Sequence, residues 1–409
     1  MKILMVNHFP LTGSGSGTYT RNLAVHLAAL GHEVCIVLPE NTTDYAVPEG
    51  IRLHPVFFTP QDGLGTEGAL PFNFPCFTSH PRSTVTFADL NEKQLDAYVG
   101  AFREAIEEEI AEHRPDVIHG QHVWILPSLA ICEDIPLILT AHGTDLMGYD
   151  KWPQFRDYAR KAMDACSFVI SISRDNCDLL RERFPEHEAK IVMMRNGSDP
   201  TVFYPQDLKR NEVLDRYGID EKEYENRKIV AFAGKLAHFK GVDVLLDAAK
   251  RYETKEPATL TLIIGDGDER DALHQQAEEL ALQRVRFLGN VDQKELCRLY
   301  NIADVGLVPS RREPFGLVAI EAMACGTPVI ASNQGGLPDF VNDSVGALAQ
   351  PEDPEDLADK IIEVLKRTDL EKTEWRQRIA AYARNHYAQD TIIRELDELY
   401  QKAVEEQWL

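Results

Sequence analysis

The sequence predicts an α/β protein made of two doubly wound domains, each with a parallel sheet covered by helices. Short apolar runs rich in Val and Ile alternate with longer segments of helical periodicity, which is typical of parallel sheets with helices on both faces. A chain of 409 residues also exceeds what one hydrophobic core usually serves, so two domains are expected.

The predicted elements form two series along the chain. In the first series, strands are expected at 3–6, 33–38, 117–119, 137–141, 168–171 and 191–194, and helices near 19–30, 92–113, 155–165 and 174–184. In the second series, strands are expected at 229–233, 260–264, 285–288, 305–309 and 329–332, and helices near 242–252, 269–282, 293–302 and 318–325. No strand is expected after residue 349, where the chain becomes helical and charged.

The two series meet at residues 196–205, where two prolines and an Asn-Gly turn signal indicate a linker. We therefore expect an N-terminal domain at 1–200, a C-terminal domain at 201–385 and a final helix at 386–409, which could cap the second domain or brace the first. Residues 59–90 are rich in Pro, Gly, Phe and Thr and lack periodicity. The four phenylalanines of this segment favour an ordered flap over a free linker.

Composition narrows the class of protein. The formal net charge of −23 repels nucleic-acid phosphate and anionic lipid, so neither is an expected partner. The apolar run at the N-terminus has four residues, too short for a signal peptide, and no stretch approaches the roughly 20 apolar residues of a membrane span. The seven cysteines are not spaced as a metal site or a redox pair. We expect a cytoplasmic protein.

A glycine-rich loop follows the first strand. Gly13, Gly15 and Gly17 allow close backbone approach to a ligand, and the next helix directs its first amides at an anion. The loop nearly matches the dinucleotide fingerprint, but Thr20 replaces the third glycine, and Glu40 stands where a ribose-binding acid could lie. The loop can therefore be interpreted as an anion-binding site or as a plain strand-to-helix turn. Its likeness to the dinucleotide fingerprint also leaves open that the protein is an NAD-dependent oxidoreductase.

Two lysines follow a strand of the second series. Gly234 ends this strand, and Lys235 and Lys240 follow in one loop before a helix begins. Each lysine is a compact point charge that can stabilise a leaving phosphate, so the pair fits a diphosphate clamp. Solvated surface lysines are the alternative.

The segment 309–332 carries the most specific pattern. Glu313 lies in a loop after a strand, Pro-Phe-Gly then opens a helix, and Glu321 lies inside that helix. Amides near Phe315, Gly316 and Leu317 offer an anion site at the helix N-terminus. Carboxylates accept hydrogen bonds from hydroxyl groups, so the order acid, amide, acid fits sugar, diphosphate and ribose. Alternatively, Glu313 caps the helix and Glu321 faces solvent, although the apolar flank argues against exposure.

Histidines follow two strands of the first series. His142 comes directly after a strand and is therefore expected at the carboxyl edge of the sheet, where open parallel sheets bind ligands. His119, His122 and Trp124 mark another strand end, and we interpret them as site-wall or packing residues rather than zinc ligands. The triplet 266–268, Asp-Gly-Asp, resembles a metal-binding pair. It is instead interpreted as a strand-to-helix turn with a helix-capping Asp.

These segments, in this order, resemble the retaining glycosyltransferases of the family that includes glycogen, sucrose and sucrose-phosphate synthases. The resemblance implies the GT-B architecture, in which two Rossmann-like domains face each other across a cleft and the helix 386–409 crosses back to the N-terminal domain. The matching segments are the glycine loop at 13–17, HGTD at 142–145, NGSD at 196–199, GKLAHFKG at 234–241, IIGDGDER at 263–270, VRFLGNV at 285–291, EPFGLVAIEAMACGTPVIAS at 313–332 and GGLPDFV at 335–341.

The resemblance also implies roles for individual residues. Glu313 would hold donor-sugar hydroxyls, and Glu321 the ribose. Lys235 and Lys240 would neutralise the diphosphate, and His142 would contact the donor sugar near the reacting carbon. Further donor-binding candidates are Gly15, Ser16, Gly17, Gly234, Asp266, Gly267, Asn290, Val291, Phe315, Gly316 and Leu317, and the acceptor candidates are His122, Trp124 and Asp145. No metal or other cofactor is implied, because lysines and helix dipoles replace it.

Two positions depart from the family pattern. Lys235 stands where many relatives have arginine, and a lysine cannot grip phosphate bidentately. Ser198 stands where an aliphatic residue is common.

The implied function is transfer of a sugar, with retained configuration, from a nucleoside-diphosphate sugar, with a UDP-sugar favoured, to a small soluble acceptor. The acceptor is expected to be soluble because the N-terminal half lacks a basic or strongly apolar surface. A nucleotide-sugar epimerase, a phosphorylase and a non-catalytic sugar-binding protein are alternatives. An NAD-dependent oxidoreductase would leave the two lysines and two glutamates without roles.

Overall fold

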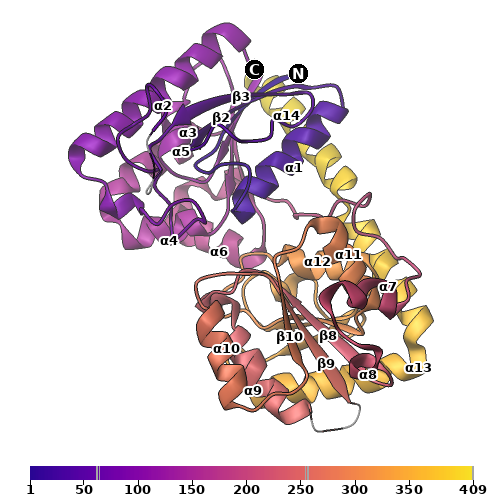
Figure 1. Cartoon of the computed structure of the whole chain (residues 1–409). Coiled ribbons are helices and arrows are strands. Elements are labelled where there is room, and N and C mark those ends of the chain that lie inside the picture. Colours follow the sequence, from indigo (N-terminus) through magenta and orange to yellow (C-terminus); the bar gives the residue numbers. More distant parts are fainter. Residues whose placement is uncertain (61–62, 64, 254, 256–257, 408–409) are drawn as a thin grey trace. The chain divides into compact units, whose positions relative to one another are not determined.

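The computed structural model describes residues 1–60, 63, 65–253, 255 and 258–407. The chain divides into two compact units (Figure 1). Unit 1 comprises Met1–Met194 and Ile393–Leu409, and unit 2 comprises Arg195–Ile392. Each unit has its own parallel sheet flanked by helices, so the predicted α/β class with two Rossmann-like domains is confirmed.

Unit 1 contains a seven-stranded parallel sheet in the order β3-β2-β1-β4-β5-β6-β7. The chain builds outward in one direction from β1 and in the other from β4, so the topological switch lies between these two strands. Open α/β sheets bind ligands at such a point, beyond the carboxyl ends of the strands. The strands are β1 (Lys2–Val6), β2 (Glu33–Glu40), β3 (Ile51–Phe57), β4 (Val117–Gln121), β5 (Leu137–Ala141), β6 (Phe168–Ser171) and β7 (Ile191–Met193).

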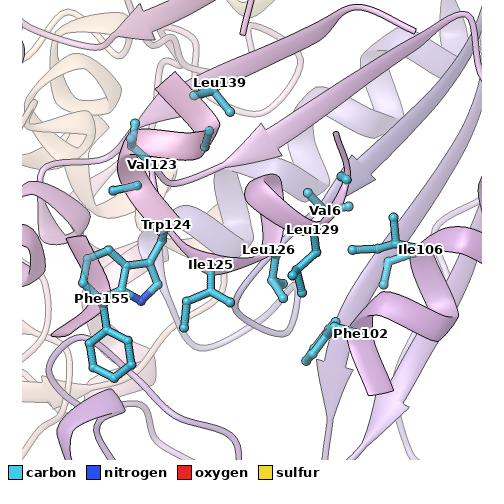
Figure 2. Close-up of a cluster of buried hydrophobic side chains, with 14 of the residues drawn as sticks. Val6, Phe102, Ile106, Val123, Trp124, Ile125, Leu126, Leu129, Leu139 and Phe155 are labelled. Atoms are coloured by element: carbon cyan, nitrogen blue, oxygen red, sulfur yellow. The ribbon is translucent and has the colours of Figure 1, made fainter. Parts of the chain in front are cut away.

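The helices of unit 1 enclose a core rich in aromatic side chains. Figure 2 shows part of this core, where Trp124 and Phe155 lie beside Ile125 and Leu126, with Phe102 on the other flank. The helices are α1 (Gly15–Ala29), α2 (Glu92–His113), α3 (Ile125–Leu129), α4 (Thr144–Lys151), α5 (Arg156–Ala165) and α6 (Arg174–Arg183), and most of α14 (Gln389–Gln407) also belongs to this unit.

The segment 59–90 is an ordered part of unit 1 over its described residues. Phe74, Phe77 and Phe87 are buried in the core, and Phe72 packs against it. The aromatic side chains therefore hold this segment, as the sequence predicted. Residues 61, 62 and 64 lie outside the described residues.

Unit 2 contains a six-stranded parallel sheet in the order β10-β9-β8-β11-β12-β13, with its switch between β8 and β11. The strands are β8 (Lys228–Ala233), β9 (Thr259–Ile264), β10 (Val285–Gly289), β11 (Val305–Val308), β12 (Val329–Ser332) and β13 (Gly346–Ala349). The helices are α7 (Arg210–Leu214), α8 (Glu221–Tyr224), α9 (Val242–Tyr252), α10 (Arg270–Glu279), α11 (Gln293–Ile302), α12 (Leu317–Ala324) and α13 (Pro354–Tyr387). Across the described ranges, no helix is both long enough and apolar enough to span a bilayer.

Candidate active site

The loops after β8 and β11 meet at the switch point of unit 2. Gly241 has φ +68°, and a Cβ there would lie 2.1 Å from the Pro309 carbonyl oxygen, so only glycine allows this approach. The Phe239 carbonyl accepts from the Arg311 amide at 2.8 Å, and the Arg311 guanidinium donates two hydrogen bonds to Asp243 at 2.6 and 2.7 Å. These contacts fix the loop after β8, which carries Lys235 and Lys240 (the lysine loop), against the loop after β11, which carries Glu313 (the glutamate loop).

The two loops bring Lys240 and Glu313 together. Lys240 Nζ donates to Glu313 Oε2 at 2.6 Å, and Ser310 Oγ donates to the same oxygen at 3.2 Å. Both side chains of the pair are largely buried, with 19% and 9% of their surface exposed. Lys235 lies in the same loop, and its Nζ is 3.1 Å from Asp268 Oδ2. The loop thus places two ammonium groups at the carboxyl edge of the sheet.

Glycines also set the backbone around Glu313. Gly335 has φ +58°, and a Cβ there would lie 2.1 Å from the Glu313 carbonyl oxygen, which accepts from the Gly336 amide at 3.0 Å. Gly316 is the N-cap of α12 with φ +101°, so Glu313 does not cap this helix. Because Gly316 has no side chain to accept from the first amides of α12, which begins at Leu317, the helix start is suited to an anion. Phe315 beside it is buried against Phe340.

Glu321 is buried one turn inside α12, with 6% of its surface exposed. Among the described residues, no hydrogen-bond or ion-pair partner meets its carboxyl group. Burial, and to a smaller extent the nearby Cys297, raise the pKa of Glu321 from 4.5 to about 8. A buried carboxyl group without a partner is costly unless a ligand provides one. Hydroxyl groups of a ribose would fill that role.

The loops after β8 and β9 also touch through glycines. A Cβ on Gly267 would lie 2.3 Å from the Leu236 carbonyl oxygen. Gly234, with φ +156°, leads into the lysine loop, and its amide donates to Ile264 at 3.0 Å. Asn290, exposed, and Val291, half-buried, follow β10 at the same edge.

The triplet 266–268 forms a strand-to-helix turn, as predicted. The prediction that an aspartate of this triplet caps α10 was wrong. The N-cap is Glu269, which makes no capping hydrogen bond with its side chain. Asp266 instead accepts from the adjacent Gly267 amide at 2.8 Å, because it lies too far before the helix to reach the first helical amides. Within the described part of the chain, no group of three or more His, Cys, Asp or Glu residues could hold a metal ion.

In unit 1, His142 lies at the carboxyl edge of the sheet, directly after β5. Its Nε2 donates to Gln121 Oε1 at 2.9 Å, and its ring meets Tyr19 edge-on at 5.1 Å. Burial lowers the pKa of His142 to about 3, so the ring is neutral near pH 7. A neutral ring in this orientation acts as a hydrogen-bonding group rather than as a cation.

Asp145 ties together the loops after β4 and β5. Its Oδ2 accepts from the Val123 amide at 2.7 Å, and its Oδ1 accepts from the His142 amide at 3.2 Å. Burial raises the pKa of Asp145 to about 6, although its backbone hydrogen bonds act against this shift. Asp145 therefore holds the backbone that carries His142.

His122 and Trp124 are wholly buried in unit 1. His122 has φ +75°, and its ring lies 4.6 Å from that of His142 and 5.0 Å from that of Phe77. Trp124 packs against Phe77 and Phe155, as Figure 2 shows for Phe155. These are packing contacts, and a role of either residue in acceptor binding stays a prediction.

The glycine loop of unit 1 leads into α1, whose first residues are Gly15 and Ser16. Its N-cap, Ser14, accepts from the Gly17 amide at 3.0 Å. A Cβ on Gly17 would lie 2.1 Å from the Pro10 carbonyl oxygen, whereas one on Gly15 would meet open space. Glu40, the ribose acid of the oxidoreductase alternative, instead forms a bidentate pair with Arg82 at 2.7 and 3.3 Å.

Several supporting residues were not identified from the sequence. His8 follows β1 as His142 follows β5, so the same strand-end rule would have found it. Its Nδ1 donates to the Gln121 carbonyl at 3.1 Å, and its Nε2 accepts from the Leu126 amide at 3.2 Å. Ser310, Gly335 and Gln121 were not singled out, because their contacts with the site are tertiary, although Gly335 begins the matching segment at 335–341.

Comparison with known proteins identifies the family of the chain. The model for glycosyltransferase family 4 matches residues 13–202, and the model for glycosyl transferases group 1 matches residues 217–386. A glycogen synthase of Mycobacterium tuberculosis is 31% identical, with the match covering 89% of this chain and 86% of the relative. A D-inositol 3-phosphate glycosyltransferase of Corynebacterium aurimucosum is 32% identical, with 89% and 88% covered.

Solved structures show the same fold. The sucrose-phosphate synthase of Thermosynechococcus elongatus superposes with a TM-score of 0.75 at 22% identity, covering 98% of both chains. Anabaena Alr3699/HepE, in complex with UDP and glucose, gives a TM-score of 0.75 at 21% identity, with 98% and 100% covered. Two Rossmann-like units of this kind define the GT-B fold. The chain belongs to the group 1 glycosyltransferases, enzymes that use nucleotide sugars.

Proposed function

We propose that the chain is a retaining glycosyltransferase that moves a sugar from a UDP-sugar to a small soluble acceptor. The observation that carries this proposal is the arrangement at the switch point of unit 2. Lys240 is held on Glu313, and the partnerless carboxyl group of Glu321 lies buried in the helix that begins beside them. This set of groups matches the chemistry of sugar hydroxyls, diphosphate and ribose in that order.

In this proposal, Glu313 accepts hydrogen bonds from the donor-sugar hydroxyls, and Glu321 accepts them from the ribose. The diphosphate lies between them, at the first amides of α12, where the helix dipole favours negative charge. Lys240 then exchanges the carboxylate for a phosphate oxygen, and Lys235 adds a second positive charge. The roles expected of His142 and of the Gly15–Gly17 loop remain predictions.

The proposed reaction proceeds on one face of the sugar. The acceptor hydroxyl attacks the anomeric carbon from the side that the diphosphate leaves, through an oxocarbenium-like state, and a leaving phosphate oxygen takes the hydroxyl proton. The charge that develops on the diphosphate is stabilised by the two lysines and the start of α12. Because these groups can supply the positive charge, we propose that turnover needs no metal ion. The seven free thiols support the proposal of a cytoplasmic location.

The nature of donor and acceptor is supported by separate observations. The Anabaena structure contains UDP and glucose, which favours UDP as the nucleotide tested first. Unit 1 contains a cavity of about 370 Å³ that is lined in part by Thr12, Glu40, Thr42 and Arg82. This volume lies in the range of small-molecule sites, and its lining mixes apolar side chains such as Leu38 and Leu53 with polar groups, which suits a small hydroxylated acceptor.

A panel of nucleotide sugars and small acceptors, scored for release of the nucleoside diphosphate, tests the proposal. We expect diphosphate release from a UDP-sugar that depends on acceptor and persists in a chelator. Proton NMR of the product should show the anomeric configuration of the donor. Conversion of donor without acceptor would indicate an epimerase, a requirement for phosphate a phosphorylase, and an inverted product would refute retention.

A further inference from the structure

Two thiols lie in contact at the end of the helix that carries Glu321. Cys297 in α11 and Cys325, the C-cap of α12, have their sulfur atoms 3.6 Å apart, and both are buried. The Cys325 amide donates to the Glu321 carbonyl at 3.3 Å, so the thiol lies one helical turn from that glutamate. The two cysteines are 28 residues apart, so their spacing along the chain does not indicate this pair.

The sulfur of Cys297 is surrounded by donors. Gln206 Nε2 and Asn301 Nδ2 each lie 3.4 Å from it, and the Cys325 thiol is the third donor. The Tyr204 carbonyl, 3.7 Å away, can accept from the protonated thiol. The hydrogen bond from Cys325 lowers the pKa of Cys297 to about 7, whereas burial raises the pKa of Cys325 well above its usual value. The two sulfurs therefore differ: one is ready to be a thiolate, and the other remains a thiol.

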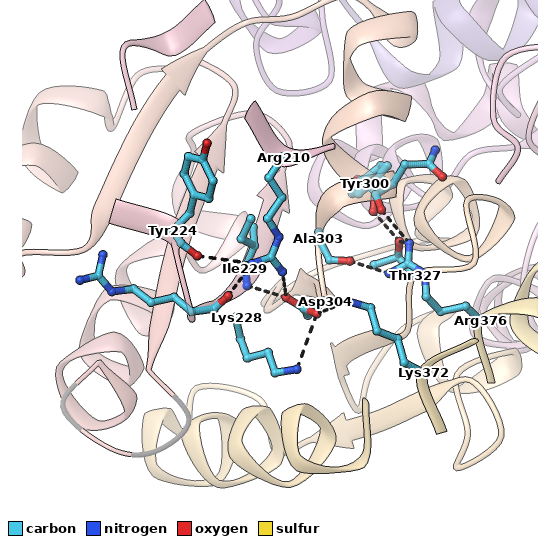
Figure 3. A network of polar contacts seen from close by, with 12 residues as sticks. Arg210, Tyr224, Lys228, Ile229, Tyr300, Ala303, Asp304, Thr327, Lys372 and Arg376 are labelled. Carbon is cyan, nitrogen blue, oxygen red and sulfur yellow. Dashed lines mark hydrogen bonds and ion pairs between the residues drawn. The ribbon is translucent and has the colours of Figure 1, made fainter. Parts of the chain in front are cut away.

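A cavity reaches Cys325 and the two side-chain amides that donate to Cys297, whereas Cys297 itself does not line it. Its volume is about 470 Å³, and Gln206, Asn301 and Cys325 are among the residues that line it. Arg210, Lys372 and Arg376 line the same cavity. Figure 3 shows how these cations are fixed: Arg210 and Lys372 pair with Asp304 at 2.7 and 3.3 Å. Arg376 donates to the Ala303 carbonyl at 2.7 Å. Positive charge near a thiol favours its oxidation, and here the cations lie on the Cys325 side of the pair, where Arg376 acts against the effect of burial on the pKa of that thiol.

We propose that Cys297 and Cys325 form a peroxide-sensitive dithiol, which closes to a disulfide between α11 and α12. The Cys297 thiolate attacks hydrogen peroxide, so that a sulfenic acid forms and hydroxide leaves. The Cys325 sulfur then displaces the hydroxyl group, which departs as water with the Cys325 proton. The hydroxide from the first step takes the proton that Cys297 had released. Two thiols are oxidised, one peroxide is reduced and two waters are formed.

Closing the bond shortens the sulfur–sulfur distance from 3.6 Å to ~2.05 Å, which draws the end of α12 toward α11. Glu321 lies on that helix, next to Cys297. The disulfide therefore acts on the carboxyl group proposed to hold the ribose, and oxidation is expected to weaken donor binding reversibly. This consequence rests on the proposed function, whereas formation of the disulfide does not.

The test exposes the full chain to a molar excess of hydrogen peroxide and maps its thiols by mass spectrometry. Trypsin should release residues 295–298 joined to residues 313–360, and two of the seven thiols should be lost. C297S and C325S should each prevent the cross-link. C166S, which removes a buried thiol of unit 1, should leave it unchanged. Seven thiols still titrating after peroxide, or another pair cross-linked, would overturn the proposal.

Calorimetric titration with UDP measures how oxidation of the two thiols changes the affinity of the donor site. Affinity should fall about tenfold on oxidation, recover with dithiothreitol and stay constant in C297S. A mapped disulfide with unchanged UDP affinity would refute the link to Glu321. If UDP does not bind the reduced protein, the proposed donor is wrong, and the thiol map alone decides whether the dithiol exists.

Discussion

Lys240 Nζ lies 2.6 Å from Glu313 Oε2, so the cation proposed for the donor diphosphate is paired with the carboxylate proposed for the donor sugar. The pair joins the loop after β8 to the loop after β11 across the switch of the unit 2 sheet. If the proposed roles hold, donor binding exchanges one contact of the lysine for another, and we therefore expect the two residues to be energetically coupled.

Glu313→Gln should separate nucleotide binding from turnover. Removing the carboxylate frees Lys240 for phosphate, so UDP should bind about two- to fivefold more tightly, a gain of about 0.4–1 kcal/mol in binding free energy. Turnover of the UDP-sugar should fall about 100-fold, because an amide holds sugar hydroxyls less well than a carboxylate. Calorimetry with UDP and steady-state kinetics measure the two effects. If UDP affinity and turnover fell by the same factor, the proposed coupling between Lys240 and Glu313 would be contradicted.

Lys240→Ala should lower kcat by about two to three orders of magnitude, because the variant loses a positive charge where the leaving diphosphate develops its own. The melting temperature should fall, because Glu313 loses its buried cation, but the variant should still be folded at the assay temperature by circular dichroism. Lys294→Ala, which removes an exposed lysine from α11, is the matched control and should keep full activity. Near-normal turnover of Lys240→Ala would refute its proposed role.

Gly335→Ala should displace the glutamate loop. The added Cβ would lie 2.1 Å from the Glu313 carbonyl oxygen, so the backbone must move. Gly218→Ala is a close control, because Gly218 has a similar φ of +64° but no atom within 4 Å of the added Cβ. Both variants lose the freedom of glycine at positive φ, but Gly335→Ala should lose about 1–3 kcal/mol more in unfolding free energy. Equal stability and equal activity in the two variants would argue against this packing.

Glu321→Gln should make stability less dependent on pH. The folded-state pKa of Glu321 is raised to about 8 from 4.5, so the folded protein binds the proton more tightly than the unfolded chain. Its favourable contribution is complete below about pH 4.5 and is lost as pH rises through 8. Glutamine should therefore stabilise the protein increasingly between pH 5 and 8, by a few kcal/mol at most, since one unit is about 1.4 kcal/mol.

Thermal unfolding across this pH range measures the difference between Glu321→Gln and the wild type. Glu278→Gln makes the same chemical change at an exposed site on α10 and should leave the pH dependence as it is. A constant difference between Glu321→Gln and the wild type at every pH would show that the carboxyl group is already ionised in the folded protein.

The sequence predicted most elements because buried strands and capped helices carry strong local patterns. Leu137–Ala141 was predicted at its observed bounds, since all five residues are apolar or small and buried. Strand β3 was missed, because it contains Pro55 and is only partly buried, as edge strands are. Helix α4 was missed because Gly143, with φ +86°, replaces a polar cap.

The site, like the fold, could be predicted only where a local pattern marks it. Lys240, Glu313, Glu321 and His142 were indicated by the sequence, because each follows a predicted strand or lies at a predicted helix start. Such positions lie at the carboxyl edge of a parallel sheet. What each side chain contacts depends on loops that are distant in sequence. The pairing of Lys240 with Glu313, 73 residues away, and the packing of Trp124 are therefore visible only in the folded structure.

Hydrogen–deuterium exchange with and without UDP tests most directly whether unit 2 binds the nucleotide between its lysine loop and α12. Binding should slow exchange of the amides in residues 234–241 and 313–321, and the effect should be weaker in Lys240→Ala. If UDP binds but these two segments exchange at the same rate with and without it, the donor site lies elsewhere in the protein.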